Sequence, residues 1–192
     1  MIHGAFVYVS QDKAGKTAKA LAIGPPDAYH GEKTERMRHV RRKKWEQGTE
    51  FIHRVMDSCA YMVLSMTGVD GLPYCVPLTP VRSGEDIYFH CAPEGEKVDA
   101  LRANPKVAMC FVGEAETVPR KFTARYSSVL ARGTAGEVVE QDEKVEALRL
   151  LCLRHCPEDM DRFDEVVRAW LPRTAVWKVH IDAAVGKANP GD

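Results

Sequence analysis

Hydrophobic and polar residues alternate along much of the chain, which predicts a mainly β protein with a few helices. Strands are expected over residues 60–66, 72–81, 87–91, 106–112, 122–139 and 175–181. Apolar residues at helical spacing predict helices over 50–58, 96–103, 142–155 and 159–170. Short turns join the first three strands, so these should form an antiparallel meander. Six antiparallel strands that curl predict a β-barrel with helices packed around it.

Glycines and prolines within the strands refine this picture. Gly133 and Gly136 interrupt the long strand and predict bulges or bends that help the sheet close. Pro73, Pro77 and Pro80 each remove a backbone N–H donor from the second strand, so its pairing should be confined to an edge or a bulge, such as a strand at the barrel rim. At the start of the first helix, Thr49 is the expected N-cap.

Residues 87–108 combine a strand, a glycine-containing loop and a helix start. Alternation in the strand puts Tyr88 and His90 on one face. The helix begins after Gly95, so Lys97 lies in its first turn, where unpaired N–H groups and the helix dipole attract an anion. A phosphate would fit such a loop. An ordinary strand, turn and helix with a solvated lysine is the alternative at this point.

Composition and charge narrow the class of protein. Lys and Arg total 27 and Asp and Glu total 27, so no general basic field favours nucleic acid or a membrane surface. The basic run within residues 36–44 is expected to be a solvated face. No apolar run approaches the roughly 20 residues that span a bilayer, and no secretory leader is visible. We expect an N-terminal extension over 1–36, one domain over 37–192, and a cytoplasmic location.

The six cysteines lie mostly within or beside apolar strand patterns, which favours buried, reduced thiols over disulfides. Cys152, His155 and Cys156 lack a second ligand pair at suitable spacing, so we expect no metal site. A nucleophile elbow, a P-loop and a GxGxxG fingerprint are also missing. Any nicotinamide donor should therefore bind only transiently.

The motif formed by Tyr88-Phe89-His90, Glu94-Gly95, Lys97, Ala100-Leu101 and Asn104-Pro105 resembles the core of the Nim-type 5-nitroimidazole resistance proteins. These belong to the FMN-binding split-barrel superfamily, which includes pyridoxamine 5'-phosphate oxidase. The resemblance extends from about Met37 to Ile181. It implies a six-stranded antiparallel split barrel, FMN as cofactor, and a homodimer in which each flavin site borrows residues from the neighbouring subunit.

The resemblance also suggests which residues meet the flavin. Lys97, with N–H groups near Gly95, would take the phosphate, and the Ser127 and Ser128 hydroxyls would bind phosphate or ring. His90 would lie beside the ring as the reactive residue, because imidazole can move a proton near neutral pH. Trp177 either flanks the flavin or packs in the core. The main chain along the ring would come from Val76, Pro77 and Leu78.

The function implied is an FMN-dependent oxidoreductase that reduces a small aromatic or nitro compound. Its electrons would come from a transient donor such as NAD(P)H or a reductase. A flavin-binding or ligand-sensing module without turnover is the alternative. Pyridoxamine phosphate oxidation itself is disfavoured, because the ending at residues 186–190 departs from the basic and aromatic substrate set of the true oxidases.

Overall fold

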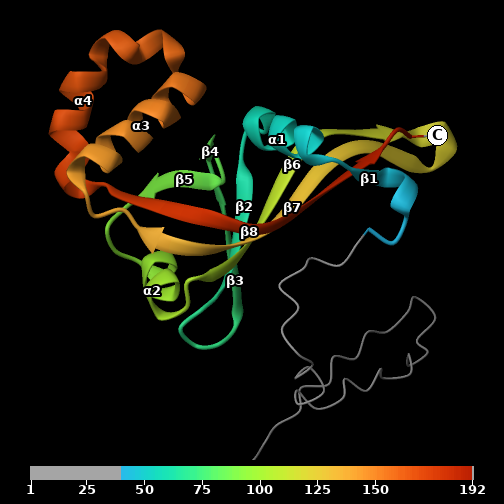
Figure 1. Cartoon of the computed structure of the whole chain (residues 1–192), viewed down its shortest axis with the longest axis horizontal. Coiled ribbons are helices and arrows are strands. Elements are labelled where there is room, and N and C mark those ends of the chain that lie inside the picture. Colours follow the sequence, from blue (N-terminus) through green and yellow to red (C-terminus); the bar gives the residue numbers. More distant parts are fainter. Residues whose placement is uncertain (1–39, 192) are drawn as a thin grey trace, which may run out of the picture. The chain divides into compact units, whose positions relative to one another are not determined.

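The computed structural model describes residues 40–191, and the predicted N-terminal extension over 1–36 lies outside that range. One antiparallel sheet of eight strands forms the body, with helices packed on it (Figure 1). The strands are β1 (Glu46–Gln47), β2 (Met62–Thr67), β3 (Pro73–Leu78), β4 (Val81–Ser83), β5 (Asp86–Cys91), β6 (Lys106–Val118), β7 (Thr123–Glu137) and β8 (Ala175–Asn189). The helices are α1 (Thr49–Ser58), α2 (Glu96–Ala103), α3 (Gln141–His155) and α4 (Phe163–Trp170).

The order of the strands shows how the sheet encloses a core. Hydrogen bonds link them as β3-β2-β6-β7-β8-β5-β4, with β1 added beside β8. The two end strands, β3 and β4, are nevertheless joined in the chain only by Thr79 and Pro80. So short a link brings the ends of the sheet together without hydrogen bonds between them. The result is a curled sheet with an open seam.

The mainly β prediction is confirmed, and two of its details are wrong. The predicted strand over 72–81 is two strands, because the chain leaves one end of the sheet at Leu78 and enters the other at Val81. The expected meander is therefore split, with β3 paired to β2 and β4 paired to β5. Six strands is also an undercount, since β4 and the two-residue β1 are too short to show an alternating pattern.

The prediction of an edge position for the proline-containing strand is confirmed. β3 pairs only with β2, where Pro73 lies opposite Thr67 and Pro77 opposite Val63. Prolines are tolerated there because no strand on the other side needs their missing N–H groups. The main chain of β3 is left with one open side.

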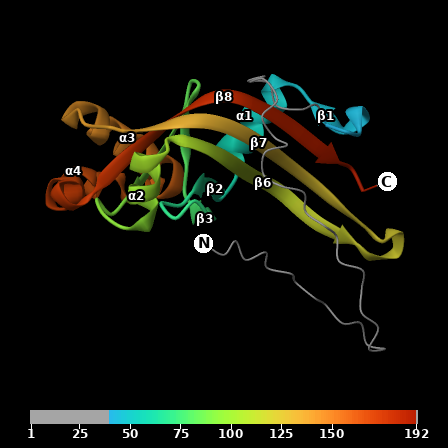
Figure 2. The same cartoon turned by 90° about the horizontal axis from the view of Figure 1, so that it is seen from below.

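β6, β7 and β8 extend well beyond the sheet's core as a long ribbon (Figure 2). The predicted strands over 106–112 and 175–181 are too short, because β6 reaches Val118 and β8 reaches Asn189. The outer part of β6 carries exposed polar residues such as Glu114 and Glu116, so it lacks a buried face that would produce apolar alternation. The outer part of β8 is mostly half-buried, but it consists largely of small or polar residues such as Ala184, Gly186 and Lys187, which do not produce that alternation either.

Two helix starts also differ from the sequence pattern. Gly48 is the residue before α1, so Thr49 is the first helical residue and caps nothing with its side chain. Residues 157–162 form a 3₁₀ segment, and α4 begins only at Phe163 rather than at Asp159. Pro157 opens this tighter segment because it lacks an N–H donor.

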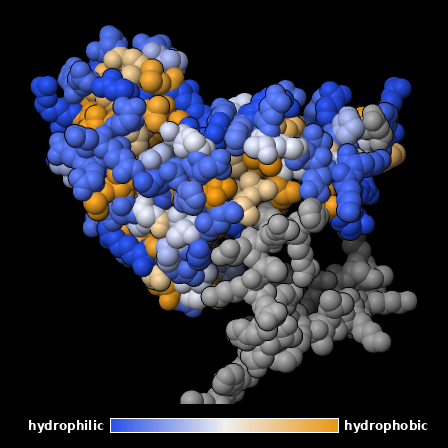
Figure 3. All heavy atoms as spheres, viewed as in Figure 1, coloured by the Kyte–Doolittle hydropathy of each residue, from blue (hydrophilic) through white to orange (hydrophobic). Residues whose placement is uncertain are grey.

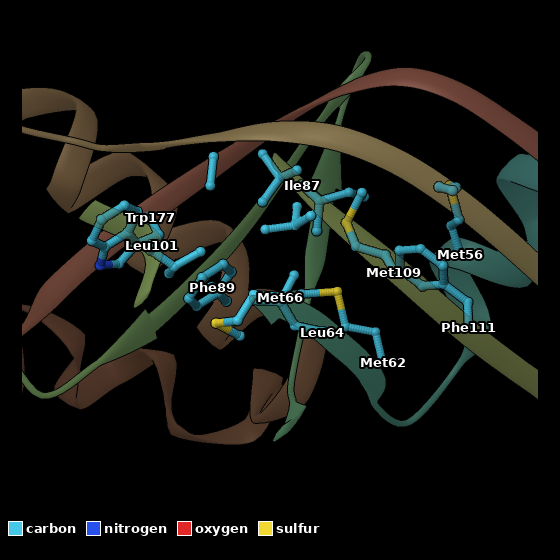
Figure 4. Close-up of a cluster of buried hydrophobic side chains, with 14 of the residues drawn as sticks. Met56, Met62, Leu64, Met66, Ile87, Phe89, Leu101, Met109, Phe111 and Trp177 are labelled. Atoms are coloured by element: carbon cyan, nitrogen blue, oxygen red, sulfur yellow. The ribbon is translucent and has the colours of Figure 1, made fainter. Parts of the chain in front are cut away.

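The main core fills the inside of the curled sheet and is closed by α1 and α2 (Figure 4). Methionine is prominent in it, and its flexible thioether fills the irregular space between a sheet and two short helices. Fully buried side chains include Met56, Met62, Leu64, Ile87, Phe89, Leu101, Met109 and Phe111. A second cluster lies beneath α3 and α4, and includes Val81, Leu148, Leu151, Phe163 and Val176.

All six cysteines are free thiols, as expected, but only Cys59 is buried. Cys75 is exposed on the edge strand, and the remaining four are half-buried. The prediction of buried thiols therefore holds at one position. No helix within residues 40–191 is long and apolar enough to cross a membrane.

Gly133 and Gly136 give a matched test of the curled sheet. The β7–β8 register shifts between Arg132 and Gly133, which confirms the predicted bulge there. A Cβ at Gly133 would clash with the backbone carbonyl of His180, whereas a Cβ at Gly136 would meet nothing within 4 Å. We expect Gly133→Ala to lower the free energy of unfolding by about 1 to 3 kcal/mol.

Urea unfolding monitored by circular dichroism measures this difference. Gly136→Ala is the control and should change stability by no more than about 0.5 kcal/mol. Equal effects of the two substitutions would contradict the role assigned to the close approach at Gly133.

Candidate functional site

The end of β5 and the start of α2 bring two of the predicted site residues together. His90 lies opposite Val176 in the β5–β8 ladder, two residues after Tyr88. Ile87 and Phe89 point into the main core, while Tyr88 packs in the second cluster toward α3. The alternation of β5 thus turns Tyr88 and His90 toward the α3–α4 side, as the pattern predicts.

The first turn of α2 suits an anion. Gly95 adopts φ 118°, a backbone conformation that favours glycine, and its carbonyl accepts the Val98 and Asp99 N–H groups. No side chain caps this helix start. Lys97 is half-buried there and has no ion-pair partner among the described residues. The exposed carboxylates of Glu96 and Asp99 in this turn oppose an anion, and the Lys97 charge offsets one of the two.

A cavity of about 590 Å³ lies between this turn and the α3–α4 pair. His90 and Lys97 both line it, together with mostly apolar side chains of the two helices. A concave, largely apolar space with a few convergent polar groups is typical of a small-molecule site. Its remaining lining is Cys91, Ala92, Leu148, Leu151, Cys152, Val166, Val167, Trp170, Leu171, Arg173 and Thr174.

The electrostatics of the cavity keep His90 uncharged near neutral pH. His90 is an exposed residue, yet neighbouring atoms partly desolvate its ring, and this desolvation is the main cause that lowers its pKa below the usual value. The nearby charges of Lys97 and His155 lower the pKa further. A neutral imidazole offers one donor and one acceptor nitrogen. His90 can therefore accept a proton or donate a hydrogen bond in this cavity.

α3 forms a fixed wall of the cavity because polar contacts attach it to the sheet. Glu143 Oε1 accepts hydrogen bonds from Tyr88 (3.0 Å) and from Lys178 Nζ (2.7 Å). The Lys178 bond is the main cause that lowers the pKa of Glu143 below its usual range. At the other end of the helix, His155 Nε2 donates to the Pro80 carbonyl at 2.8 Å. Arg154 donates to the carbonyls of Met56 and Cys59.

The remaining predicted site residues lie elsewhere. Val76 and Leu78 turn inward against the main core, and Pro77 is exposed on the open edge of β3. Ser127 lines a different cavity of about 460 Å³, near the β6–β7 turn, and Ser128 follows it in β7. Figures 1 and 2 place that turn and α2 toward opposite ends of the sheet. One chain therefore does not bring the serines to His90 and Lys97.

Trp177 lies in the main core, where only 3% of its surface is exposed. It is opposite Phe89 in the β5–β8 ladder and packs with the buried residues of the curled sheet (Figure 4). Its indole N–H is buried without a hydrogen-bond partner among the described residues. Of the two alternatives for Trp177, a flank to the flavin or core packing, the structure shows core packing. Trp177 therefore has little surface left for a cofactor.

Sequence reasoning missed two residues of the cavity wall, Trp170 and Arg173. The apolar spacing of α4 indicated only that Trp170 would pack on the protein, and Arg173 belonged to no motif. Trp170 is 59% exposed, so much of its side chain is not buried by packing on the protein. An aromatic residue at a helix end followed by Pro172 and Arg173 was the available signal.

Comparison with known proteins places the fold. The family model described as pyridoxamine 5'-phosphate oxidase matches residues 49–188. A candidate 5-nitroimidazole antibiotic resistance protein from Bacteroides thetaiotaomicron aligns with a TM-score of 0.60 and 23% identity, over 75% of this chain and 90% of that chain. No curated protein matches in sequence.

Two further solved structures share the fold. The flavocytochrome Anf3 from Azotobacter vinelandii has a TM-score of 0.66 and 22% identity, over 79% of this chain and 72% of that one. An FAD and heme binding protein from Mycobacterium smegmatis has a TM-score of 0.62 and 20% identity, over 74% and 71%. At such identities the similarity establishes the fold, and function must be argued from the site.

The lowered pKa of His90 gives a direct test of the site's electrostatics. Lys97→Gln removes a nearby positive charge, so the pKa of His90 should rise toward its usual value. The pKa of His90 is lower in the folded protein than in the unfolded chain, so the unfolded chain binds the proton more readily. His90 should therefore lower the free energy of unfolding only as the pH falls below the usual histidine range. NMR titration of the imidazole signals measures the pKa in both proteins.

Lys121→Gln, at the far β6–β7 turn, is the control and should leave the His90 titration unchanged. A His90 pKa at or above the usual value would contradict this picture of the cavity, as would equal responses to the two lysine substitutions.

Proposed function

The chain belongs to the pyridoxamine 5'-phosphate oxidase family, and from that premise we propose that it is an FMN-dependent oxidoreductase acting on a small aromatic or nitro compound. One observation carries this proposal. His90 and Lys97 line a single apolar cavity where β5 ends and α2 begins. A proton-carrying group and an anion-binding group thus lie together in a space large enough for a planar molecule.

The phosphate of FMN would bind at the start of α2. Lys97 and the backbone N–H groups of the first turn would hold it, because Gly95 lets the chain approach closely and no side chain caps the helix. One such turn suits a mononucleotide, whereas FAD carries a second phosphate. The open main chain of β3 at Val76, Pro77 and Leu78 would contact the ring.

A homodimer would complete the site. Ser127 and Ser128 lie toward the opposite end of the sheet from Lys97, so they reach the same flavin only if they come from a second copy of the chain. A twofold axis would then create two equivalent sites. It would also cover exposed apolar residues and the open β3 edge.

The chemistry divides between cofactor and protein. Bound FMN would supply two-electron transfer, with electrons from a transient donor such as NAD(P)H or a reductase. A nitro group that takes up two electrons and two protons becomes a nitroso group and water. His90 is neutral at rest, so it would take up a proton from solvent before it donates that proton to the substrate oxygen, and apolar side chains of α3 and α4 line the cavity around it.

Stopped-flow absorbance tests this function. Protein loaded with FMN and reduced anaerobically should be reoxidised by a 5-nitroimidazole faster than free reduced FMN is. Because a positioned general acid contributes about a hundredfold to ten-thousandfold, His90→Ala should slow this step by at least about tenfold while FMN affinity changes little.

His180→Asn is the matched control, since His180 bonds to Asp86 on the exposed surface outside this cavity. It should leave the rate unchanged. If the loaded protein reacts no faster than free reduced FMN, the oxidoreductase proposal fails and a flavin-binding module without turnover becomes the better account.

A further inference from the structure

Side chains on the α3–α4 side of the cavity beside His90 indicate which class of ligand it binds. We propose that it binds planar aromatic carboxylates, with the Trp170 indole stacking on the ring and the Arg173 guanidinium pairing with the carboxylate. This inference rests on the proposed function, because it names the substrate class for the same site. The observations that support it concern the side chains of the cavity wall and not the flavin.

The wall that α3 and α4 give to the cavity is apolar, and part of its apolar surface is exposed. Leu148 and Leu151 of α3 line the cavity together with Val166 and Trp170 of α4. Val166 is 42% exposed and Trp170 is 59% exposed, so neither is buried in the second core cluster. Figure 3 shows hydrophobic side chains gathered among polar ones over the α3–α4 end of the protein. An exposed indole in an apolar recess favours a flat aromatic ligand.

The charges that line the cavity all have one sign. Lys97 and Arg173 both line it, and no carboxylate does. Neither cation has an ion-pair partner within residues 40–191. Three other cavities in the described part of the chain each include an acidic residue, namely Asp164, Glu114 or Asp182. This cavity therefore selects for a negative ligand, and guanidinium is well suited to a carboxylate.

The two proposed ligand contacts are held in a fixed relation. Thr174 Oγ1 donates to the Trp170 carbonyl at 2.9 Å, which closes the turn between Trp170 and Arg173. The helix itself is attached to α3, because Arg149 pairs with Asp164 at 3.3 Å and lies 4.2 Å over the Phe163 ring. A wall ordered before binding loses less entropy when a ligand arrives.

The two cations have separate tasks in this account. Lys97 lies in the first turn of α2, where the phosphate of FMN would occupy it. Arg173 follows α4, two residues before Ala175, which pairs with Cys91 at the end of β5, and it remains available to the substrate. A neutral aromatic compound would use only the Trp170 contact, whereas a carboxylate would use both. The difference between two such ligands isolates Arg173.

Isothermal titration of 4-nitrobenzoate and 4-nitrobenzamide into the protein loaded with oxidised FMN tests this inference. The two probes share the nitro-substituted ring and nearly the same shape, but only the carboxylate is charged and only the amide carries N–H donors, so the wild-type protein should bind the carboxylate about tenfold or more tightly. Arg173→Gln should remove that preference and leave the amide affinity unchanged. Trp170→Ala should weaken both probes by about fivefold, and Trp170→Phe should restore most of the loss.

Arg168→Gln is the matched control, because Arg168 lies on α4 but lines the neighbouring cavity. It should leave both affinities unchanged. Equal affinities for the two probes would overturn the inference, as would a loss of preference in Arg168→Gln equal to that in Arg173→Gln. FMN titration separates the two proposals: absence of FMN binding refutes the proposed function, whereas FMN binding without carboxylate preference refutes only this inference.

Discussion

The structure depends on a two-residue connection between strands at opposite ends of one sheet. Thr79 and Pro80 are all that separates β3 from β4, so the sheet must curl until its ends meet. Curling encloses the methionine-rich core, and α1 and α2 close it. The same connection fixes the cavity wall, because the Pro80 carbonyl accepts a hydrogen bond from His155 at the end of α3. Fold and site are thus linked at one point.

This architecture gives each chain half of a flavin site in our account. The curled end of the sheet carries His90, Lys97 and the cavity beneath α3 and α4. The long β6–β8 ribbon carries Ser127, which lines a separate cavity, and Ser128 beside it. Under the proposed function, the serines would reach this site only from a second subunit. A dimer would therefore be needed to complete each site under that proposal.

Sequence reasoning succeeded where local pattern determines structure. Alternation in β5 and the glycine before α2 correctly predicted the strand and the helix that carry His90 and Lys97, because both features lie within a dozen residues. The roles of these two residues at a flavin stay a prediction. The split of residues 72–81 into two end strands was missed, since it depends on pairing with β2 and β5 rather than on the strand itself. Trp170 and Arg173 were missed because their role arises from where α4 packs.

The central claim is that two chains share each flavin site, and a mixed dimer tests it most directly. Lys97→Ala and Ser127→Ala/Ser128→Ala homodimers should each bind FMN more weakly, by about 1.5 to 3 kcal/mol for the lost charge-assisted bond of Lys97. A heterodimer of the two chains contains one site with both defects and one with none. FMN titration should therefore find half an equivalent per chain bound with wild-type affinity. A heterodimer without any wild-type site would contradict the account.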